Sequence, residues 1–224
     1  LLMHGVLNAL RLESDSTLYV EAGVPGAKLA RFAAANNLSG AAFFAGIPGT
    51  MGGMLAMNAG CYGSETWEKV LRVQTVDRKG DMHIRMPGDY DIGYRHVALH
   101  QPHEEFFVAA WLEFEQGVAE AARRNIKELL NKRIASQPLN LPNAGSVFRN
   151  PPGDHAARLI QQCGLKGRQV GGAKVSEKHA NFIVNSGDAT AADIENLIQE
   201  VQDTVEKQTG VKLQCEVRII GEKL

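Results

Sequence analysis

The chain has 224 residues, enough for one large domain or two smaller ones. Hydrophobic residues make up 44% and charged residues 22%, and 24 basic side chains nearly balance 25 acidic ones, for a net charge of −1. These values are typical of a globular protein, and the even spread of charge argues against a nucleic-acid-binding surface. No apolar run approaches the roughly 20 residues that a membrane-spanning helix needs, so we expect no membrane segment.

The three cysteines and the start of the chain bear on its cellular setting. Cys61, Cys163 and Cys215 lie far apart and form no Cys-x-x-Cys pair. This odd number and spacing argue against a disulfide framework and a zinc site, so we expect no metal and a reducing compartment, the cytoplasm. The opening stretch, "LLMHGVLNALRLES", lacks the basic region and the small-residue cleavage site of a signal peptide. Because it also lacks an initial Met, we expect the natural chain to extend upstream of Leu1.

The first half of the chain is predicted to contain mostly strands. Segment 17–23, "TLYVEAG", alternates and ends in glycine, which predicts a strand. Residues 26–40 are predicted to form a short helix with a glycine at its end. The segments "VLRVQTVD" and "MHIRM" flank "RKGD" at 78–81, which is a hairpin pattern, and 106–115 is a further apolar strand.

The second half is predicted to contain three helices and a closing strand. Three segments show the helical spacing of apolar residues: 118–134, 154–165 and 190–210. Asp154 and Thr190 are the expected N-caps of the second and third helices, and 211–220 is an expected closing strand. Helices and strands mix without a regular βαβ alternation, which favours an α+β fold.

A glycine-rich segment, "GIPGTMGG" at 46–53, stands between the predicted elements. Its glycines permit backbone geometries that other residues avoid, so we expect no helix interior there. A run of exposed N–H groups can cradle phosphate without Lys or Arg, and "MNAG" at 57–60 adds a side-chain amide. The alternative to a phosphate-binding loop is a tight turn in a packed protein. The spacing fits neither a Walker A loop nor the Rossmann G-x-G-x-x-G pattern.

Five segments in order resemble one family. They are "GIPGTMGGMLAMNAGCYG" at 46–63, "GYRH" at 93–96, "PNAGSVFRNP" at 142–151, "VSEKHANFIVNSGDATAADI" at 175–194 and "CEVRIIGE" at 215–222. Together they resemble the UDP-N-acetylenolpyruvoylglucosamine reductases, the MurB family. The resemblance implies an FAD-binding domain of the vanillyl-alcohol-oxidase (PCMH) type, followed by a smaller α+β substrate-binding domain. We expect these at 1–117 and 118–224.

The resemblance also implies an activity. NADPH reduces bound FAD, and a hydride then passes to the enolpyruvyl group of a UDP-sugar, giving UDP-N-acetylmuramate for peptidoglycan synthesis. Family members carry, upstream of the match, a first lobe of the FAD domain with a Gly-Ser-Asn phosphate loop. We therefore expect this chain to be incomplete at its N-terminus and to hold FAD poorly. A non-catalytic UDP-sugar-binding module is the alternative, and a different flavin oxidoreductase is a third.

Three residues are implied to be catalytic. Ser146 lies on a Gly-Ser turn without a His partner, which suits a hydroxyl that protonates the substrate carbon. Arg95 can grip a carboxylate with two hydrogen bonds, and Glu216, if buried and neutral, can donate to the developing acid-enolate. Each residue also has a non-catalytic interpretation. The hydroxyl of Ser146 would hydrogen-bond the backbone of its own turn, Arg95 would be a surface residue, and Glu216 would face solvent and pair with Arg218.

The remaining candidates are implied contacts of the two ligands. Those for the FAD are Gly46, Ile47, Pro48, Gly49, Thr50, Gly52, Gly53, Asn58, Ala59 and Gly60. Those for the UDP-sugar are Tyr94, Arg133, Gln137, Asn143, Asn150, Lys174 and His179. In isolation, each of the polar substrate candidates is an ordinary surface residue. We expect a monomer.

Overall fold

The computed structural model describes residues 5–221, so that residues 1–4 and 222–224, including the last residue of the 215–222 segment, lie outside it. The chain divides into two compact units, Leu1–Lys132 and Arg133–Leu224. The division falls within helix α3, Ala119–Ser136, and not at its start. The functional assignment of 1–117 and 118–224 therefore stays a prediction. None of the described helices has the length and apolarity to cross a membrane.

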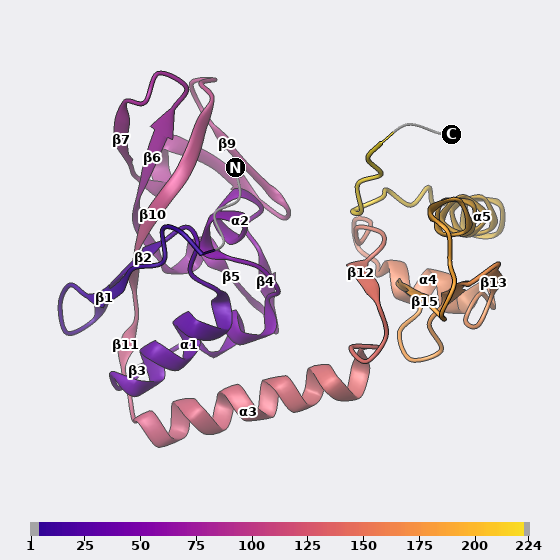
Figure 1. The fold of residues 1–224 in the computed structure, drawn as a ribbon, viewed down its shortest axis with the longest axis horizontal. Coiled ribbons are helices and arrows are strands. Elements are labelled where there is room, and N and C mark those ends of the chain that lie inside the picture. The colour runs from indigo at the N-terminus through magenta and orange to yellow at the C-terminus, as the bar shows by residue number, and fades with distance from the viewer. Residues whose placement is uncertain (1–4, 222–224) are drawn as a thin grey trace. The chain divides into compact units, whose positions relative to one another are not determined.

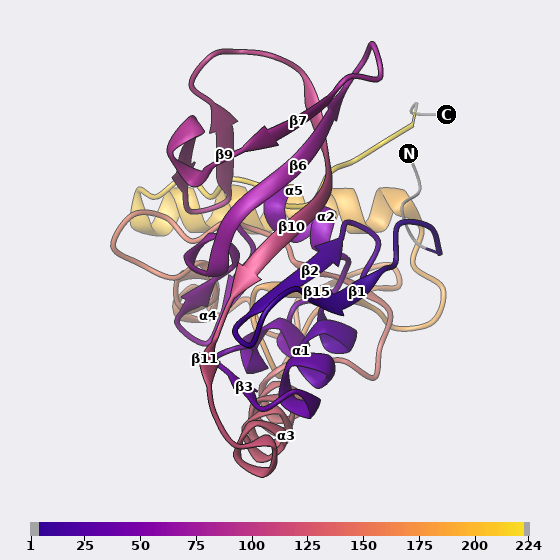
Figure 2. The ribbon, with the colours of Figure 1, turned by 90° about the vertical axis from the view of Figure 1, so that its left-hand side faces the viewer.

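The first unit is built on a five-stranded antiparallel sheet in the order β1-β2-β10-β6-β7 (Figures 1 and 2). Its strands are β1 Leu10–Leu12, β2 Thr17–Glu21, β6 Val70–Asp77, β7 Met82–Arg85 and β10 Glu105–Glu113. The predicted strand at 17–23, the hairpin around 78–81 and the strand at 106–115 are confirmed. Buried residues of β2, β6 and β10 share a core with α1, Gly26–Ala35, which confirms the predicted first helix.

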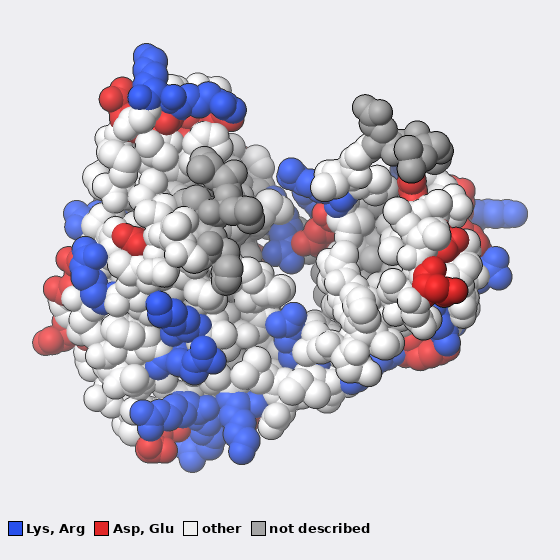
Figure 3. Space-filling view, viewed as in Figure 1, with Lys and Arg blue, Asp and Glu red and all other residues white. Residues whose placement is uncertain are grey.

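Short elements complete this unit. They are β3 Leu38–Ser39 paired with β11 Glu115–Gln116, β4 Gly60–Cys61 paired with β5 Ser64–Glu65, the hairpin of β8 Tyr90–Gly93 and β9 His96–Leu99, helix α2 Met51–Ala56, and the 3-10 turns Ala42–Gly46, Thr66–Lys69 and Pro87–Asp89. Helix α3 packs Ile126 against the same core, and its Arg123, Arg124, Lys127 and Lys132 are exposed. Basic groups gather around the start of this helix (Figure 3).

The glycine-rich segment departs from its prediction, because Gly52 and Gly53 lie inside α2. A Cβ on Gly52 would lie 3.1 Å from the Cβ of Ala22, so a glycine lets the helix approach the end of β2 closely. The N–H groups of Met51 and Gly52 donate to the carbonyls of Val24 and Ala22, at 2.9 and 2.8 Å. The glycines therefore serve helix packing as well as backbone freedom.

The second unit has a four-stranded antiparallel sheet in the order β12-β15-β14-β13. Its elements are β12 Asn143–Ser146, α4 Ala156–Gln162, β13 Gln169–Val170, β14 Ala173–Val175, β15 Phe182–Asn185 and α5 Ala191–Thr209. Buried residues of both helices and of β14 and β15 form its own core. Both predicted helices are confirmed. The predicted cap of α5 is confirmed too, since the hydroxyl of Thr190 accepts from the N–H of Asp193 at 3.1 Å.

Two predictions for this unit were wrong. The N-cap of α4 is His155 and not Asp154, and the side chain of Asn150 accepts from the N–H of Ala156 at 3.1 Å. Asp154 instead accepts the N–H of His155 and pairs with a guanidinium one turn on. Segment 211–220 forms only an isolated bridge between Cys215 and Phe148. The facing segment runs into two prolines, which lack the N–H groups that a longer ladder needs.

Candidate functional site

The loop before α2 exposes glycine backbone. Pro48 and Gly49 are exposed although the turn before them and Met51 after them are buried. Gly49 has a φ of +118°, and no protein atom lies within 4 Å of the position that a Cβ would take there or on Gly53. Ile47 differs, because its N–H already donates to the carbonyl of Phe44 at 3.2 Å. Open backbone suited to a close ligand is thus concentrated at Gly49 and Gly53.

Asn58 connects this segment to the hairpin that carries Arg95. The side chain is only 4% exposed, and its Nδ2 donates to Glu65 Oε2 at 2.7 Å and to the carbonyl of Gly93 at 3.3 Å. Its Oδ1 accepts the N–H of Trp67 at 3.1 Å. These internal contacts give Asn58 a bracing role, while its predicted contact with FAD stays a prediction. The structure thereby brings together two regions that are far apart in the sequence.

Arg95 occupies a strained position beside a cavity. It lies in the two-residue turn between β8 and β9, where Gly93 pairs with His96, and has a φ of +55°. A non-glycine residue in this left-handed region is uncommon, and such strain is often found at functional sites. The cavity measures about 330 Å³, and its lining includes Tyr94, Arg95 and two carboxylates, Glu65 and Glu68.

Sequence reasoning missed these two carboxylates. They come from "GSETWEK", in which the pairing of β4 with β5 and the 3-10 turn at Thr66–Lys69 place them on the cavity wall. A local sequence signal for them does not exist, because charged residues in a loop are usually solvated. Only the bracing by Asn58 shows that this loop lies against the arginine hairpin.

Ser146 ends β12 in a backbone frame that is held from two sides. Gly145 before it has a φ of +82°, and its N–H donates to the side chain of Asn143 at 2.9 Å. Ser146 pairs with Phe182 of β15, and the N–H of Val147 donates to the carbonyl of Asn181 at 2.9 Å. The predicted Gly-Ser turn is therefore an irregular strand end with a fixed backbone.

Asn181 is a second residue that sequence reasoning missed. It is 4% exposed, its Oδ1 accepts the N–H of Phe148 at 3.0 Å, and its Nδ2 donates to the carbonyl of Phe148 at 2.8 Å. A side-chain amide that hydrogen-bonds both the N–H and the C=O of one residue takes the place of a neighbouring strand for that residue. An asparagine inside the apolar stretch "HANFIV" is the signal that could have identified it.

Glu216 lies next to the serine segment in the same unit. Its N–H donates to the carbonyl of Val147 at 2.8 Å, so that the segment after Ser146 runs between Asn181 and Glu216. Glu216 is half-buried. The second unit therefore brings two of the three predicted catalytic residues onto neighbouring segments, while Arg95 belongs to the first unit.

The predicted substrate residues of the second unit have local partners. Arg133 Nε donates to Gln137 Oε1 at 2.9 Å, Asn143 Nδ2 donates to the carbonyl of Leu141 at 2.7 Å, and Lys174 Nζ lies 3.6 Å from Glu177 Oε1. The side chain of Asn150 accepts the N–H of Ala156 at the start of α4, as described above. Each of these side chains thus has a partner within the protein, and direct roles in binding stay predictions.

His179 lines a separate cavity of about 450 Å³ together with Arg158, Gln161 and Lys178. Burial, followed by the nearby charge of Lys166, holds the pKa of His179 below its ordinary value. Its Nδ1 accepts the N–H of Asn181 at 3.3 Å, so the neutral ring carries its proton on Nε2. Lys174, another predicted substrate residue, is not among the residues that line this cavity.

Comparison with known proteins first gives the class. Residues 2–84 match the family model described as an FAD binding domain, which gives the class of the first part of the chain. Residues 137–220 match the model described as the C-terminal domain of UDP-N-acetylenolpyruvoylglucosamine reductase. The order of the two matches is that of the two units.

Individual relatives then give the family. A UDP-N-acetylenolpyruvoylglucosamine reductase of Thiobacillus denitrificans is 58% identical over 100% of this chain and 73% of its own length. The protein of the same name from Nitrosomonas eutropha is 57% identical, over 98% of this chain and 69% of its own. The crystal structure of the enzyme (MurB) from Thermus caldophilus has a TM-score of 0.81 at 33% identity, covering 95% of this chain and 74% of that one. The chain belongs to the UDP-N-acetylenolpyruvoylglucosamine reductase family, which confirms the resemblance and the expected α+β fold.

The structure fits the cofactor of this class in one respect. FAD carries a pyrophosphate, which exposed backbone N–H groups can bind without a basic side chain. The open glycine backbone at Gly49 and Gly53 provides such a surface. The N–H groups of Ile47 and Gly52 are used within the fold, so fewer of the predicted donors are available than the sequence indicated.

Proposed function

We propose that this chain reduces the enolpyruvyl group of a UDP-N-acetylglucosamine enol ether to UDP-N-acetylmuramate, with NADPH as the reductant. The observation that carries the proposal is 58% identity to a named reductase over the whole chain. In this proposal, 1–117 bind FAD and 118–224 bind the substrate. The three free cysteines suit a reducing compartment, and we place the reaction in the cytoplasm.

The reaction sets the tasks of the side chains. FAD, when bound, supplies the hydride chemistry. Addition of hydride to the terminal carbon of the double bond leaves negative charge on the neighbouring carbon, and this charge spreads into the attached carboxylate. The chain must stabilise that charge and deliver one proton to carbon.

Ser146 is the proposed proton donor. Its backbone is fixed by the β12–β15 pairing and by the hydrogen bond from Val147 to Asn181, so the hydroxyl starts from a defined position. A positioned donor of this kind contributes about 10²–10⁴-fold in rate. A serine hydroxyl does not ionise freely at neutral pH, so neighbouring groups must stabilise the alkoxide as it forms.

Arg95 and Glu216 are the proposed electrostatic partners. A guanidinium pairs with a carboxylate through two parallel hydrogen bonds, which strengthen as negative charge builds up. The cavity beside Arg95 already holds Glu65 and Glu68, so the arginine sits among carboxylates before any substrate arrives. The half-buried Glu216, in its neutral form, would donate a hydrogen bond to the same developing acid-enolate.

The test separates the two half-reactions. In a form of the protein that holds FAD, Ser146→Ala should leave flavin reduction by NADPH nearly unchanged and slow reoxidation by the enolpyruvyl substrate by about 10²–10⁴-fold. Both are followed by stopped-flow absorbance of the flavin. The exposed Ser186 offers a matched control, Ser186→Ala, for which both half-reactions should keep the wild-type rates. Equal loss of both half-reactions in Ser146→Ala would contradict the proton-donor role.

A further inference from the structure

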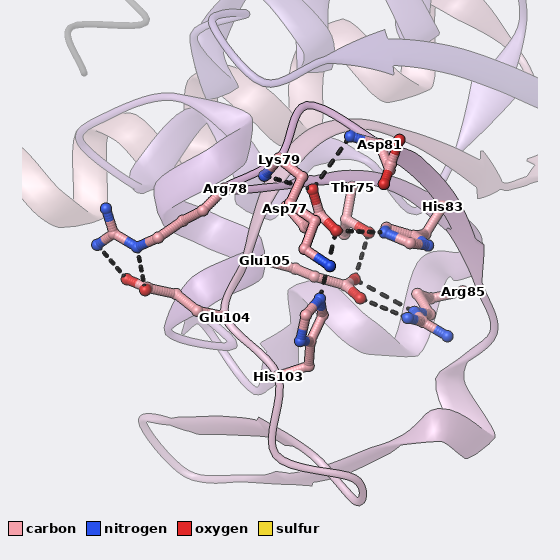
Figure 4. Close-up of polar contacts among 10 residues, drawn as sticks. All are labelled: Thr75, Asp77, Arg78, Lys79, Asp81, His83, Arg85, His103, Glu104 and Glu105. Carbon is pink, nitrogen blue, oxygen red and sulfur yellow. Dashed lines mark hydrogen bonds and ion pairs between the residues drawn. The ribbon is translucent and has the colours of Figure 1, made fainter.

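Three potential metal-ligating side chains meet at one end of the first unit's sheet. Asp77 ends β6, His83 lies in β7 and His103 lies in the loop before β10 (Figure 4). Asp77 Oδ2 lies 3.3 Å from His83 Nε2 and 3.4 Å from His103 Nε2. The three ligand atoms all lie within 4.8 Å of one another.

The carboxylate is oriented by its own turn. Asp77 is 8% exposed, and its Oδ1 accepts the N–H groups of Lys79 and Asp81, at 2.8 and 3.0 Å. Its second oxygen, Oδ2, faces both imidazoles. Outer hydrogen bonds of this kind orient the ligands of metal sites.

The distances match a metal polyhedron. With metal–ligand bonds of roughly 2.0–2.1 Å, the ligand atoms of a tetrahedral zinc site lie about 3.3–3.4 Å apart. Two of the three ligand pairs already have this separation. Each histidine approaches through Nε2, which is a ring nitrogen that commonly binds metal. Two histidines and one carboxylate form a ligand set known for divalent d-block ions.

The surroundings permit a cation there. The two arginines drawn beside the cluster in Figure 4 are each paired with a carboxylate, Arg78 with Glu104 and Arg85 with Glu105, so their charges are compensated. His103 also lines a cavity of about 630 Å³. A metal held by three protein ligands would therefore have access to water for its fourth position.

We propose that Asp77, His83 and His103 bind one divalent d-block ion, for which Zn²⁺ is the probe. The ion would clamp the β6–β7 turn to the loop that leads into β10. The site is independent of FAD and of the residues around Ser146, so its test stands apart from the proposed reductase activity.

The experiment is a competition between the full chain and a chromophoric chelator for Zn²⁺ alone, under reducing conditions. Wild type should bind one equivalent. His103→Ala and Asp77→Asn should each weaken binding by more than about 100-fold, the upper end of the loss seen for outer-shell contacts. Both variants should fold, because the His103 side chain is 51% exposed and Asn keeps an oxygen for the turn N–H groups; circular dichroism checks this.

A second histidine–carboxylate pair provides the matched control. His96 Nε2 lies 3.2 Å from Asp91 Oδ2 but has no third ligand among the described residues, so His96→Ala should bind Zn²⁺ like wild type. Co²⁺ in place of Zn²⁺ should give visible bands without the near-ultraviolet absorption of thiolate ligation. Wild-type affinity in both ligand variants, thiolate absorption, or no binding of one equivalent would overturn the proposal and leave a purely hydrogen-bonded triad.

Discussion

At the scale of single residues, the site depends on backbone positions that cost free energy. Arg95 has a φ of +55° and Asn58 a φ of +40°. The side chain of Asn58 donates a hydrogen bond to the carbonyl of Gly93, in the hairpin that carries Arg95. A fold keeps such positions only where the surroundings over-determine them. Here the buried amide of Asn58 supplies that determination, and the guanidinium is thereby held at the cavity.

Arg95→Gly and Arg95→Ala separate strain from charge. Both remove the guanidinium, so reoxidation of reduced flavin by substrate should slow by about 10²–10³-fold in each. Glycine tolerates the left-handed backbone, so its variant should be more stable to unfolding than the alanine variant by about 1 kcal/mol. Chemical denaturation measures the difference, and a more stable alanine variant would contradict the strain.

His179 should make stability depend on pH. Burial and Lys166 lower its folded pKa, so the unfolded chain takes up a proton first as pH falls below about 6.5. The stability associated with the neutral ring is thus present above that pH and is lost between it and the lowered folded pKa. Denaturation at a series of pH values should show a shallower fall for His179→Gln than for wild type. Parallel curves would contradict this.

At the scale of elements, two short contacts hold neighbouring segments together. One is the close approach of α2 to β2 at Gly52, and the other is the pair of hydrogen bonds from the Asn181 side chain to Phe148. Neither is a long regular element. Each contact depends on one residue type: a glycine without a Cβ in the first case and a side-chain amide in the second. Even small substitutions at Gly52 or Asn181 should therefore lower the free energy of unfolding.

Adjacent glycines of α2 form a matched pair. Gly53→Ala should raise the free energy of unfolding by about 0.5–1 kcal/mol, because its side chain meets open space and alanine favours helix. Gly52→Ala places a Cβ 3.1 Å from Ala22 Cβ, so it should be less stable than Gly53→Ala by at least about 1 kcal/mol. Thermal unfolding compares them. Equal stabilities of the two variants would show that α2 moves away from β2 to accommodate the added Cβ and would contradict the expected clash.

Asn181→Ala should destabilise the second unit. The change leaves two buried backbone groups of Phe148 without partners, at a cost of about 1–3 kcal/mol for each. The exposed Asn140→Ala is the control and should stay close to wild type. Chemical denaturation followed by circular dichroism measures both. A loss as small as that of the control would mean that water replaces the amide.

At the scale of the whole molecule, two separate cores underlie the two units. Leu29 belongs to the first core and Leu197 to the second, and both are fully buried. Both tryptophans, Trp67 and Trp111, lie in the first unit, so tryptophan fluorescence reports on that unit alone. The long helix α5 contributes to circular dichroism from the second.

Cavity-forming substitutions should therefore act on one unit each. Leu197→Ala and Leu29→Ala each cost about 2–5 kcal/mol in their own core. Leu197→Ala should lower the midpoint by circular dichroism and leave the fluorescence midpoint in place, and Leu29→Ala should lower the fluorescence midpoint. If both signals shifted together in both variants, the units would unfold as one.

Much of this protein followed from its residues alone. Alternation predicted the strand at 17–23, and an apolar run predicted the strand at 106–115. Helical spacing and capping predicted α5, and five ordered segments indicated the family. These signals are local or written in residue order. Tertiary structure decided the rest. It placed Gly52 inside a helix, moved the N-cap of α4 from Asp154 to His155, and left 211–220 without a strand. It also brought Asn58 to Gly93, Asn181 to Phe148 and Asp77 to two histidines. Each of these depends on contacts between segments distant in the chain, and no local pattern records which distant partner will fill a space or satisfy a buried polar group.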